Sequence, residues 1–592
     1  MPYASLREFV DALDAAGELH RVAEPVSCML EVSAIADRVS KSAAANVSGN
    51  AEKFDPLHHT LGGKALLFEN VTLPDGARSE VPLLINAFGS YRRVEMALGC
   101  EQGGLQQIAD KVEQLVKPEP PTGLMNKMKK GLELAKIAQL PPKVVKSGRC
   151  QEVVVQGDDI DLLKLPVIQC WPDDGDPRKC GYPLSPEQAG TADGLGRYIT
   201  LAGMYTIHPD DAGKPDGEPR TSRNVGMYRA QLIDEKRTAM HWHIHHDGAR
   251  HWRAWKEHNE ARGDHSGGMP CAIVLGGESV LPYAATAPLP PGISELLFAG
   301  LLNDHAIKMV RCKTIDIHVP ANAEIVIEGT VSTEAGTIGF DPRAAMADGG
   351  LRMGDRSDPS AIRDPKSAIG TGAIPGLRTE IEVFEGPFGD HTGFYSLPDR
   401  YPVFTASAVT MCKDPLYPTT IVGPPPQEDY YLGKATERIF LPLLKTLVPD
   451  IIDYDLPMFG CFHNCAFLKI KKEYPLQARR VMHAIWGAGQ MAWTKVIVVV
   501  DHDVDVHNHE DVLFHLCANA DPGRDIEIVN GPLDILDHAA PRLGAGHKIG
   551  FDATRKVPGE EVNGNPVRDW PTYLGQLDLD EKLQAIVDAA SA

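Results

Sequence analysis

Glu385-Gly-Pro-Phe-Gly-Asp-His-Thr-Gly393 is the stretch around which the rest of the 592-residue sequence can be organised. It places two carboxylates, Glu385 and Asp390, five residues apart, among glycines and a proline that forbid a regular helix or strand. Such a sharply turned loop can aim two acids into one pocket, where unequal surroundings keep one protonated and the other ionised near pH 7. An ordinary surface turn with two solvated acids is the alternative, and the composition of this segment alone favours it.

The length and composition indicate a multidomain globular protein with an acidic balance of charge. A chain of 592 residues is too long for a single core, so we expect roughly two to four domains. The 59 basic and 80 acidic residues give a net charge of −21, which disfavours binding to nucleic acids or anionic membranes. The first residues do not resemble a signal peptide, no apolar run is long enough to span a membrane, and the eleven cysteines are scattered. We therefore expect a cytoplasmic protein with free thiols.

Local patterns predict the secondary structure of the first part of the chain. A capping box at Ser5–Glu8 begins a helix. Apolar runs over residues 65–68 and 82–86 predict buried strands. Prolines bracket a predicted helix over residues 124–140, which makes residue 146 a candidate domain boundary.

The middle of the chain reads as strands joined by long loops, and the last third alternates helices with strands. Strands are expected over residues 197–207 and 230–233. Three segments rich in Gly, Pro and Asp are expected to be insertions, lids or irregular loops, over residues 172–195, 209–223 and 339–376. Toward the C-terminus the pattern predicts a helix, an apolar strand of a parallel sheet and an amphipathic helix, over residues 478–486, 495–501 and 579–587.

The run Asp501–His509 is rich in aspartate and histidine and has the appearance of a metal site. In the helical zinc motif that begins with His509, however, the second histidine falls at His515, two residues too late to share one helix face with the first. We therefore interpret the run as the end of a strand and a polar loop that caps the next helix.

Two segments place histidines, an asparagine and an arginine near one another in the sequence. Asn224–Arg229 precedes a predicted strand. His241–His246 is read as a strand, on which alternation puts His241, His243 and His245 on one face. Such a face suits an anionic ligand or a metal, and a solvent-facing histidine-rich strand explains this segment alone equally well.

A turn over residues 288–295 presents Glu295 just before an apolar helix, where an acid alone would complement the helix dipole. Together with the other motifs, it forms an ordered set that resembles the UbiD-type decarboxylases, the family of 3-polyprenyl-4-hydroxybenzoate decarboxylase. The resemblance covers about residues 5–557. The segments that carry it are Asn224–Arg229, His241–His246, Ser294-Glu295, Ala323–Gly329, Glu385–Gly393, Tyr417–Glu428, Arg479–His483 and Gly550–Lys556.

The resemblance implies a mixed α/β (α+β) multidomain fold with a flavin cofactor. The expected parts are an α/β N-terminal domain over residues 1–146, a split β-barrel flavin-binding domain over 147–402, and a C-terminal α/β domain over 403–592 whose terminal helix reaches a partner subunit. The central domain would carry insertions near 172–223 and 339–376. Members use prenylated FMN with a divalent metal, usually manganese, and often potassium at the phosphate. The implied partners are further copies of the chain, in a dimer or hexamer, and a flavin prenyltransferase that supplies the cofactor.

The resemblance also implies roles for individual residues. The metal and phosphate ligands are matched by Asn224, His245 and Glu295. An amide oxygen, an imidazole and a carboxylate are a sensible set for Mn²⁺. The catalytic network is matched by Arg229, Glu385 and Asp390. The cofactor lining is matched by Met227, Tyr228, Arg229, His241, Trp242, His243, His246 and Asp247.

Two departures from the family pattern bear on this site. His241 and His246 stand where some members carry arginine, so neutralisation of the cofactor phosphate would differ. The segment over residues 339–376 separates Glu328 from Glu385, which lie close together in shorter members. A lid or an oligomer contact would account for such an insertion.

The reaction implied is the reversible decarboxylation of an aromatic acid, either hydroxylated or a quinone precursor. The cofactor would take up the charge that remains when CO₂ leaves, since side chains cannot do so. Arg229 would orient the substrate carboxylate, and Asp390 would return a proton to the carbon. We expect Arg229 to pair mainly with Glu385 and the substrate, which leaves Asp390 as the carboxyl group that retains its proton.

Other functions would also account for part of this sequence. A carboxylase, or a decarboxylase that degrades a simple aromatic acid, would use the same residues. A metal-dependent hydrolase built on the histidine-rich segment would bind no flavin and would leave Arg229 and the 385–393 loop unexplained. A non-catalytic subunit of a carboxylase complex would have no need of the intact Arg229, Glu385 and Asp390.

Overall fold

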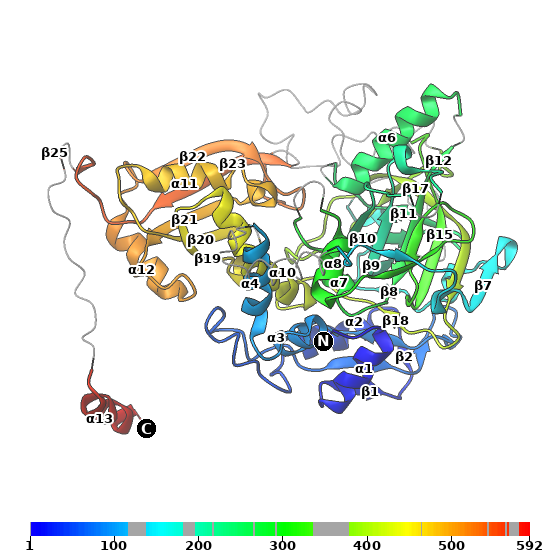
Figure 1. The fold of residues 1–592 in the computed structure, drawn as a ribbon, viewed down its shortest axis with the longest axis horizontal. Helices are drawn as coiled ribbons and strands as arrows, with labels where there is room; N and C mark the ends of the chain where they lie inside the picture. The colour runs from blue at the N-terminus through cyan, green and yellow to red at the C-terminus, as the bar shows by residue number, and fades with distance from the viewer. Residues whose placement is uncertain are drawn as a thin grey trace, which may run out of the picture.

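The computed structural model of the chain describes residues 2–116, 138–180, 196–215, 218–244, 246–264, 267–289, 293–335, 378–462, 464–541, 544–562, 565–566 and 579–591. Four expectations lie wholly or mostly outside the described residues: most of the helix over 124–140, most of the loop over 172–195, His245, and the insertion over 339–376. The rest forms an N-terminal layer, a β-barrel and a C-terminal α/β unit (Figure 1). The long helix α10 (Glu428–Leu447) packs against both the first and the last of these parts.

The first helix, α1 (Leu6–Ala15), begins at the predicted capping box. The Ser5 hydroxyl accepts a hydrogen bond from the backbone N–H of Glu8 at 3.2 Å, and the Glu8 carboxylate accepts one from the N–H of Ala4. Behind α1 lies a four-stranded sheet that includes both predicted strands of this region. Its strands, in spatial order, are β1 (Leu19–Val22), β3 (Ala65–Phe68), β5 (Leu83–Ile85) and β18 (Tyr417–Pro418). Three more helices and a short strand pair complete the layer: α2 (Glu31–Ser40), α3 (Tyr91–Leu98), α4 (Gly104–Val116), β2 (Val26–Ser27) and β4 (Val71–Thr72).

The centre of the molecule is a closed antiparallel barrel. Its strands, in order around the barrel, are β9 (Arg197–Thr206), β10 (Asn224–Leu232), β11 (Arg237–Met240), β17 (Asp399–Met411), β15 (Ile325–Ser332) and β12 (Gly268–Leu275), which returns to β9. Short strands extend it: β7 (Val153–Gln156) and β16 (Glu382–Glu385) pair with β17, and β8 (Ile168–Gln169) pairs with β9. Around the barrel lie α6 (Asp247–Ala261), α7 (Leu281–Ala284), α8 (Glu295–Asn303) and a small sheet of β6 (Lys143–Val144), β13 (Lys308–Arg311) and β14 (His318–Pro320).

The structure corrects two sequence predictions in this barrel. Asn224–Arg229 does not precede a strand but forms the first part of β10, because it pairs antiparallel with β9. In the segment His241–His246, the described residues, 241–244 and 246, form no strand: the pairing of β11 with β10 ends at Met240, and Asp247 begins α6. The strand-like alternation expected for His241 and His243 is therefore wrong.

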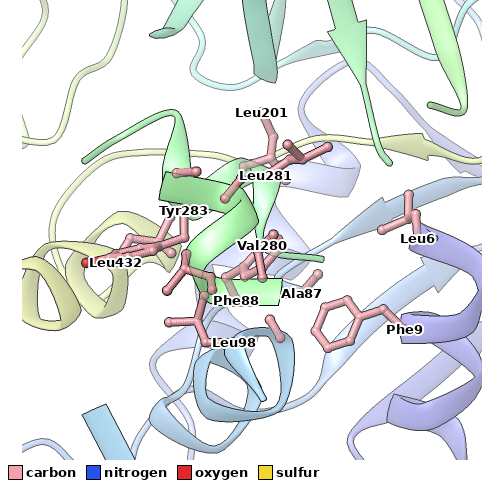
Figure 2. Close-up of a cluster of buried hydrophobic side chains, with 14 of the residues drawn as sticks. Leu6, Phe9, Ala87, Phe88, Leu98, Leu201, Val280, Leu281, Tyr283 and Leu432 are labelled. Carbon is pink, nitrogen blue, oxygen red and sulfur yellow. The ribbon is translucent and has the colours of Figure 1, made fainter. Parts of the chain in front are cut away.

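A shared apolar core fixes the barrel to the N-terminal layer. Helix α7 lies between them, and its side chains contact residues from both parts and from α10 (Figure 2). The labelled members of this cluster are Leu6, Phe9, Ala87, Phe88, Leu98, Leu201, Val280, Leu281, Tyr283 and Leu432. Because such a core is closely packed, the barrel strands that carry the candidate site are held in a rigid frame.

The C-terminal unit is a mixed sheet covered by helices, as the alternating pattern predicts. Its strands, in spatial order, are β19 (Ile451–Asp455), β20 (Cys465–Ile470), β21 (Val496–Asp501), β23 (Ala545–Asp552) and β22 (Ile526–Pro532). The predicted apolar strand is β21, which is buried and parallel to both neighbours. The predicted helix over 478–486 is α11 (Gln477–Ile485). The Asp501–His509 run begins at the end of β21, and its Asn508 caps α12 (His509–Asn519), as interpreted, while His507 of the same run belongs to a group of possible metal ligands. The last described elements are β24 (Glu561–Val562), β25 (Asn565–Pro566) and the predicted terminal helix α13 (Glu581–Ser591).

The predicted fold class is confirmed, whereas the exact domain limits stay a proposal. The expected boundary between residues 402 and 403 would cut through β17, so we propose to place it just before α10, which keeps the barrel whole. Among the residues described, no helix is both long and apolar enough to cross a membrane.

Candidate active site

Arg229 on β10 brings the two acids of the 385–393 loop together. Its Nε donates to Glu385 Oε1 at 2.7 Å, Nη2 donates to Glu385 Oε2 at 3.2 Å, and Nη1 donates to Asp390 Oδ2 at 2.5 Å. All three side chains are buried, with exposed fractions of 9% for Arg229, 0% for Glu385 and 8% for Asp390. The solvated surface turn is therefore excluded, and the three residues predicted as a catalytic network lie in contact.

Backbone contacts hold the loop between the two acids in its turned shape. Asp174 accepts a hydrogen bond from the N–H of Gly389 at 2.7 Å, and Gln231 accepts one from the N–H of Gly386 at 3.0 Å. The Phe388 ring lies 4.5 Å from the guanidinium carbon of Arg229, a cation–π contact. Sequence reasoning missed Asp174 and Gln231, because neither belongs to a recognisable motif and Asp174 lies in a segment interpreted as an insertion.

The pair of protonation states at Glu385 and Asp390 differs from the pair expected from the sequence. Burial would raise the pKa of Glu385, but Arg229 and His241 outweigh it and hold that pKa at about 2. Burial acts the same way on Asp390, yet His391 and Arg229 bring its pKa below the usual range. The expectation that Asp390 retains its proton is therefore wrong, although Arg229 makes two hydrogen bonds to Glu385 and one to Asp390. Arg229 contacts both acids, and both are ionised.

His391 is the protonated member of this group. Its Nδ1 lies 2.9 Å from Asp390 Oδ1. Although burial disfavours the imidazolium, Asp390, Asp534 and Asp429 raise the pKa of His391 to about 9. His391 belongs to the 385–393 motif, but nothing in the sequence predicted a role for it.

The residues expected to line the cofactor gather beside Arg229. His241 Nδ1 lies 2.9 Å from Glu385 Oε2, and the rings of His243 and His246 stack at 4.7 Å. The ring of Tyr228 lies 4.8 Å from that of His246. Two buried ring nitrogens, His241 Nε2 and Trp242 Nε1, have no hydrogen-bond partner in the described part of the chain. Such unpaired buried nitrogens are expected where a polar ligand completes a site.

Two of the three expected metal ligands meet at one cavity. Asn224 and Glu295 line a cavity of about 120 Å³, together with Asp247 at the start of α6. Ser294 caps α8 and so places Glu295 in its first turn, as predicted. Burial raises the pKa of Glu295 to about 7, although Arg223 and Arg250 line the same cavity, and a cation bound to the carboxylate would lower that pKa again. The donors present therefore fit a divalent cation and a phosphate, while His245 lies outside the described residues.

A second group of possible ligands lies in the C-terminal unit. Single ligand atoms of Glu437, Asp455 and His507 come within 4.8 Å of one another. The Lys434 ammonium already contacts Glu437 at 2.8 Å and Asp455 at 2.6 Å, so a positive charge is supplied by the chain itself. We interpret this group as a buried ion-pair cluster that ties α10 to β19.

Replacement of Gly389 by alanine is expected to destabilise the loop without adding charge. The new Cβ would lie 2.1 Å from Trp171 Cδ1, so the indole or the loop must move. Overpacking of this kind costs about 1–3 kcal/mol in the free energy of unfolding, and we expect a lower midpoint in urea denaturation. Gly49→Ala is the matched control, since its Cβ meets nothing within 4 Å. An unchanged midpoint for Gly389→Ala would show that the loop is not held against Trp171.

Comparison with known proteins adds the family context. Three family models match the chain: the 3-octaprenyl-4-hydroxybenzoate carboxy-lyase N-terminal domain over residues 10–112, the Rift-related domain over 143–340 and 371–425, and the C-terminal domain over 430–553. The central match is interrupted over residues 341–370, within the segment interpreted as an insertion.

Relatives match over nearly the whole chain. An uncharacterised protein of Aquifex aeolicus (strain VF5) is 40% identical over 572 residues, which are 97% of this chain and 95% of that protein. The closed form of the vanillic acid decarboxylase of Sedimentibacter hydroxybenzoicus is 22% identical, covers 100% of this chain and 99% of its own, and has a TM-score of 0.70. An evolved dimeric form of the UbiD-class enzyme HmfF from Pelotomaculum thermopropionicum, in complex with prFMN, is 22% identical, covers 95% and 97%, and has a TM-score of 0.61. At these identities the two solved structures support the fold alone.

Proposed function

Because this chain belongs to the UbiD family of carboxy-lyases, we propose that it releases CO₂ from a hydroxylated aromatic acid with prenylated FMN as its cofactor. The observation that carries the proposal is the buried contact of Arg229 with Glu385 and Asp390. A fixed cation can bind a substrate carboxylate, and a neighbouring acid can return a proton after CO₂ has left. The same site would run in reverse as a carboxylase at high CO₂.

Arg229 is the residue that we assign to the substrate carboxylate. Glu385 and Asp390 raise the pKa of its guanidinium, so Arg229 stays positively charged whatever the pH of the assay. Glu385 accepts from Nε of the Arg229 guanidinium, and a substrate carboxylate can compete with Asp390 for Nη1. When that exchange occurs, Asp390 loses one of the two cations that depress its pKa, His391 being the other, and takes up a proton more readily.

The cofactor and its cation would be held by the groups beside β10. The flavin, when bound, supplies the electron sink that decarboxylation of an aromatic ring requires. Asn224 and Glu295 would bind the cation, manganese or another divalent metal with potassium in addition, and His245 is the third ligand that the motif implies. The indole N–H of Trp242 would donate to the flavin or its phosphate, whereas Nε2 of His241, whose Nδ1–H donates to Glu385, would accept a hydrogen bond from the flavin.

Glu295→Ala is expected to leave a folded protein with little metal and little flavin. The change removes the carboxylate that lines the cation cavity, while Ser294 still caps α8. Metal content by mass spectrometry and flavin content by absorbance, both on protein produced together with a flavin prenyltransferase, measure the effect. We expect occupancy to fall at least about tenfold, the size seen when a group that supports a metal site is removed.

The matched control for this variant is Glu257→Ala, because Glu257 is an exposed acid on α6 that lies outside the cavity. It should keep the metal and flavin content of the unchanged protein. If Glu295→Ala also keeps both, the cation binds elsewhere and our assignment of the ligands is mistaken.

The proposed reaction itself is tested with the protein loaded by a flavin prenyltransferase. Aromatic acids, hydroxybenzoates and hydroxynaphthoates first, are screened for CO₂ release and for loss of the acid by chromatography. We name quinone precursors as first candidates and simple aromatic acids for degradation as second. A purified protein that holds no flavin and releases CO₂ from none of these acids would contradict the proposal.

We also propose that the active form is a homo-oligomer, a dimer or a hexamer, in the cytoplasm. The terminal helix α13 supports this proposal, because it lies away from the rest of the ribbon and its apolar side chains are exposed (Figure 1). On α13 these side chains are Leu583, Ile586 and Val587, and Leu579 is exposed just before the helix. An isolated helix of eleven residues is marginal in water, so a neighbouring subunit is a natural partner for its apolar face.

A further inference from the structure

Decarboxylation consumes one proton in every turnover, because a C–H bond replaces the bond to the carboxylate. In the structure, Asp390 cannot supply that proton directly, since its neighbours keep it ionised. Arg229 cannot supply it either, because a guanidinium does not lose its proton in a protein. A site that works near pH 7 therefore needs another acid within reach of Asp390.

His391 is placed to be that acid. Its Nδ1 lies 2.9 Å from Asp390 Oδ1, while Arg229 contacts the other oxygen, Oδ2. The two partners thus hold separate oxygens of one carboxylate. A proton that arrives from His391 reaches the oxygen that the guanidinium does not occupy.

The surroundings of His391 keep its imidazole charged. Three carboxylates act on it: Asp390 from its own loop, Asp429 from the first turn of α10, and Asp534 from the loop after β22. Together they raise the pKa of His391 to about 9 against the opposing effect of burial. Two of the three come from α10 and the C-terminal unit, so the charge of His391 depends on how that unit packs against the barrel.

The C-terminal unit also covers the ring. Phe462, whose ring centre lies 5.4 Å from that of His391, comes from the segment between β19 and β20. Its φ of 70° and the φ of 45° at Cys461 are left-handed conformations that cost about 1–3 kcal/mol each in residues other than glycine. The Phe462 ring thus packs an apolar group from the C-terminal unit beside His391.

We propose that His391 is the proton store of the active site and that it protonates Asp390 in each turnover. The inference rests on the proposed decarboxylase function and adds to it a proton source. In the first step the Nδ1–H bond of the imidazolium breaks and an O–H bond forms at Asp390 Oδ1. In the second step that O–H bond breaks and the C–H bond of the product forms. Water then returns a proton to the neutral imidazole as the product leaves, and the balance is one proton per CO₂.

His391→Gln in the cofactor-loaded enzyme is the central test, since glutamine keeps a polar side chain but holds no transferable proton. We expect kcat to fall by about 10²-fold, the usual size of a general-acid effect, with KM changed less than about twofold. In the unchanged enzyme the rate should decline above a pH of about 9, where His391 loses its proton. That alkaline decline should be absent from the residual rate of the variant. His20→Gln, an exposed histidine on β1, is the control and should behave as the unchanged enzyme.

A second measurement keeps the test independent of turnover. Imidazole resonances of the cofactor-free protein, assigned by comparison with His391→Gln, should show one histidine that titrates near pH 9. Asp534→Asn should lower that value, since it removes one of the three facing carboxylates. A His391 that titrates below pH 7, or a His391→Gln enzyme with unchanged kcat and pH profile, overturns the proposal. Failure of the unchanged enzyme to release CO₂ would count against the proposed function instead, and the titration would still decide whether His391 stores a proton.

Discussion

Arg229→Ala is expected to abolish measurable decarboxylation and to destabilise the fold. Loss of one preorganised charged donor from an active site costs about 10²–10³-fold in kcat, and here the same change also removes the proposed binder of the substrate carboxylate. It leaves Glu385, which is fully buried, without its main partner. Removal of one member of a buried ion pair typically costs about 3–5 kcal/mol in the free energy of unfolding.

The destabilisation by Arg229→Ala should depend on pH in a defined direction. In the unchanged protein the pKa of Glu385 is held at about 2, below its unfolded value, so its contribution to stability is present above about pH 4.3 and is lost as pH falls toward 2. In the variant, burial without Arg229 raises the pKa of Glu385, and the ionised carboxylate then destabilises the folded protein. This destabilisation is present at pH 7 and decreases as the pH falls, because the carboxyl group then gains a proton.

Urea denaturation of both proteins at pH 7 and about pH 5 measures this effect. The difference between their midpoints should be larger at pH 7. Arg178→Ala is the control, because the Arg178 side chain is 42% exposed and its ion pair with Asp176 lies at the surface. An equal difference at both pH values would mean that the variant suffers from lost packing rather than from unpaired carboxylates.

Short sequence patterns correctly predicted the helices and strands whose ends are set by neighbouring residues. The helix at Ser5–Glu8, the buried strands and the capped helix that begins at Glu295 follow from capping, apolar runs and turns, and each is confirmed. The histidine-rich segment was misread because its end is set by pairing with a distant strand. β11 stops at Met240, where its partner β10 has its bulge, and no residue in 241–246 marks that end.

The members of the candidate site could be predicted from sequence, but their charges could not. Arg229 and Asp390 are 161 residues apart in the chain, and only the closed barrel brings them into contact. A protonated Asp390 was expected because Arg229 was assigned mainly to Glu385. Since the pKa of a buried acid follows the cations that touch it, the contacts of Asp390 with His391 and Arg229 reverse the prediction. Asp174 and Gln231 were missed for a related reason: they act on backbone N–H groups of the loop, which leave no pattern in the sequence.

Asp390→Asn is expected to bind cofactor and substrate normally and to lose turnover. The amide keeps the size of the carboxylate, and its oxygen can still accept from Arg229 Nη1, so the loop should keep its shape. An amide carries no proton that it can transfer, so we expect kcat to fall by about 10²–10⁴-fold. The ring C–H of the product should also cease to exchange with D₂O, because exchange uses the same proton transfer in reverse.

The ionised state of Asp390 makes this prediction sharper. If the acid only balanced the charge of Arg229, replacing it with asparagine would leave the guanidinium freer to bind the substrate carboxylate, and KM would fall with kcat little changed. If Asp390 accepts a proton from His391 and returns it to the product, kcat falls while flavin content stays constant. Absorbance of the bound flavin, single-turnover CO₂ release and D₂O exchange separate the two cases. Asp158→Asn, a change at a fully exposed side chain, serves as the control. Normal turnover by Asp390→Asn, in protein shown to hold the prenylated flavin, would remove both Asp390 and the proton path through His391 from the mechanism.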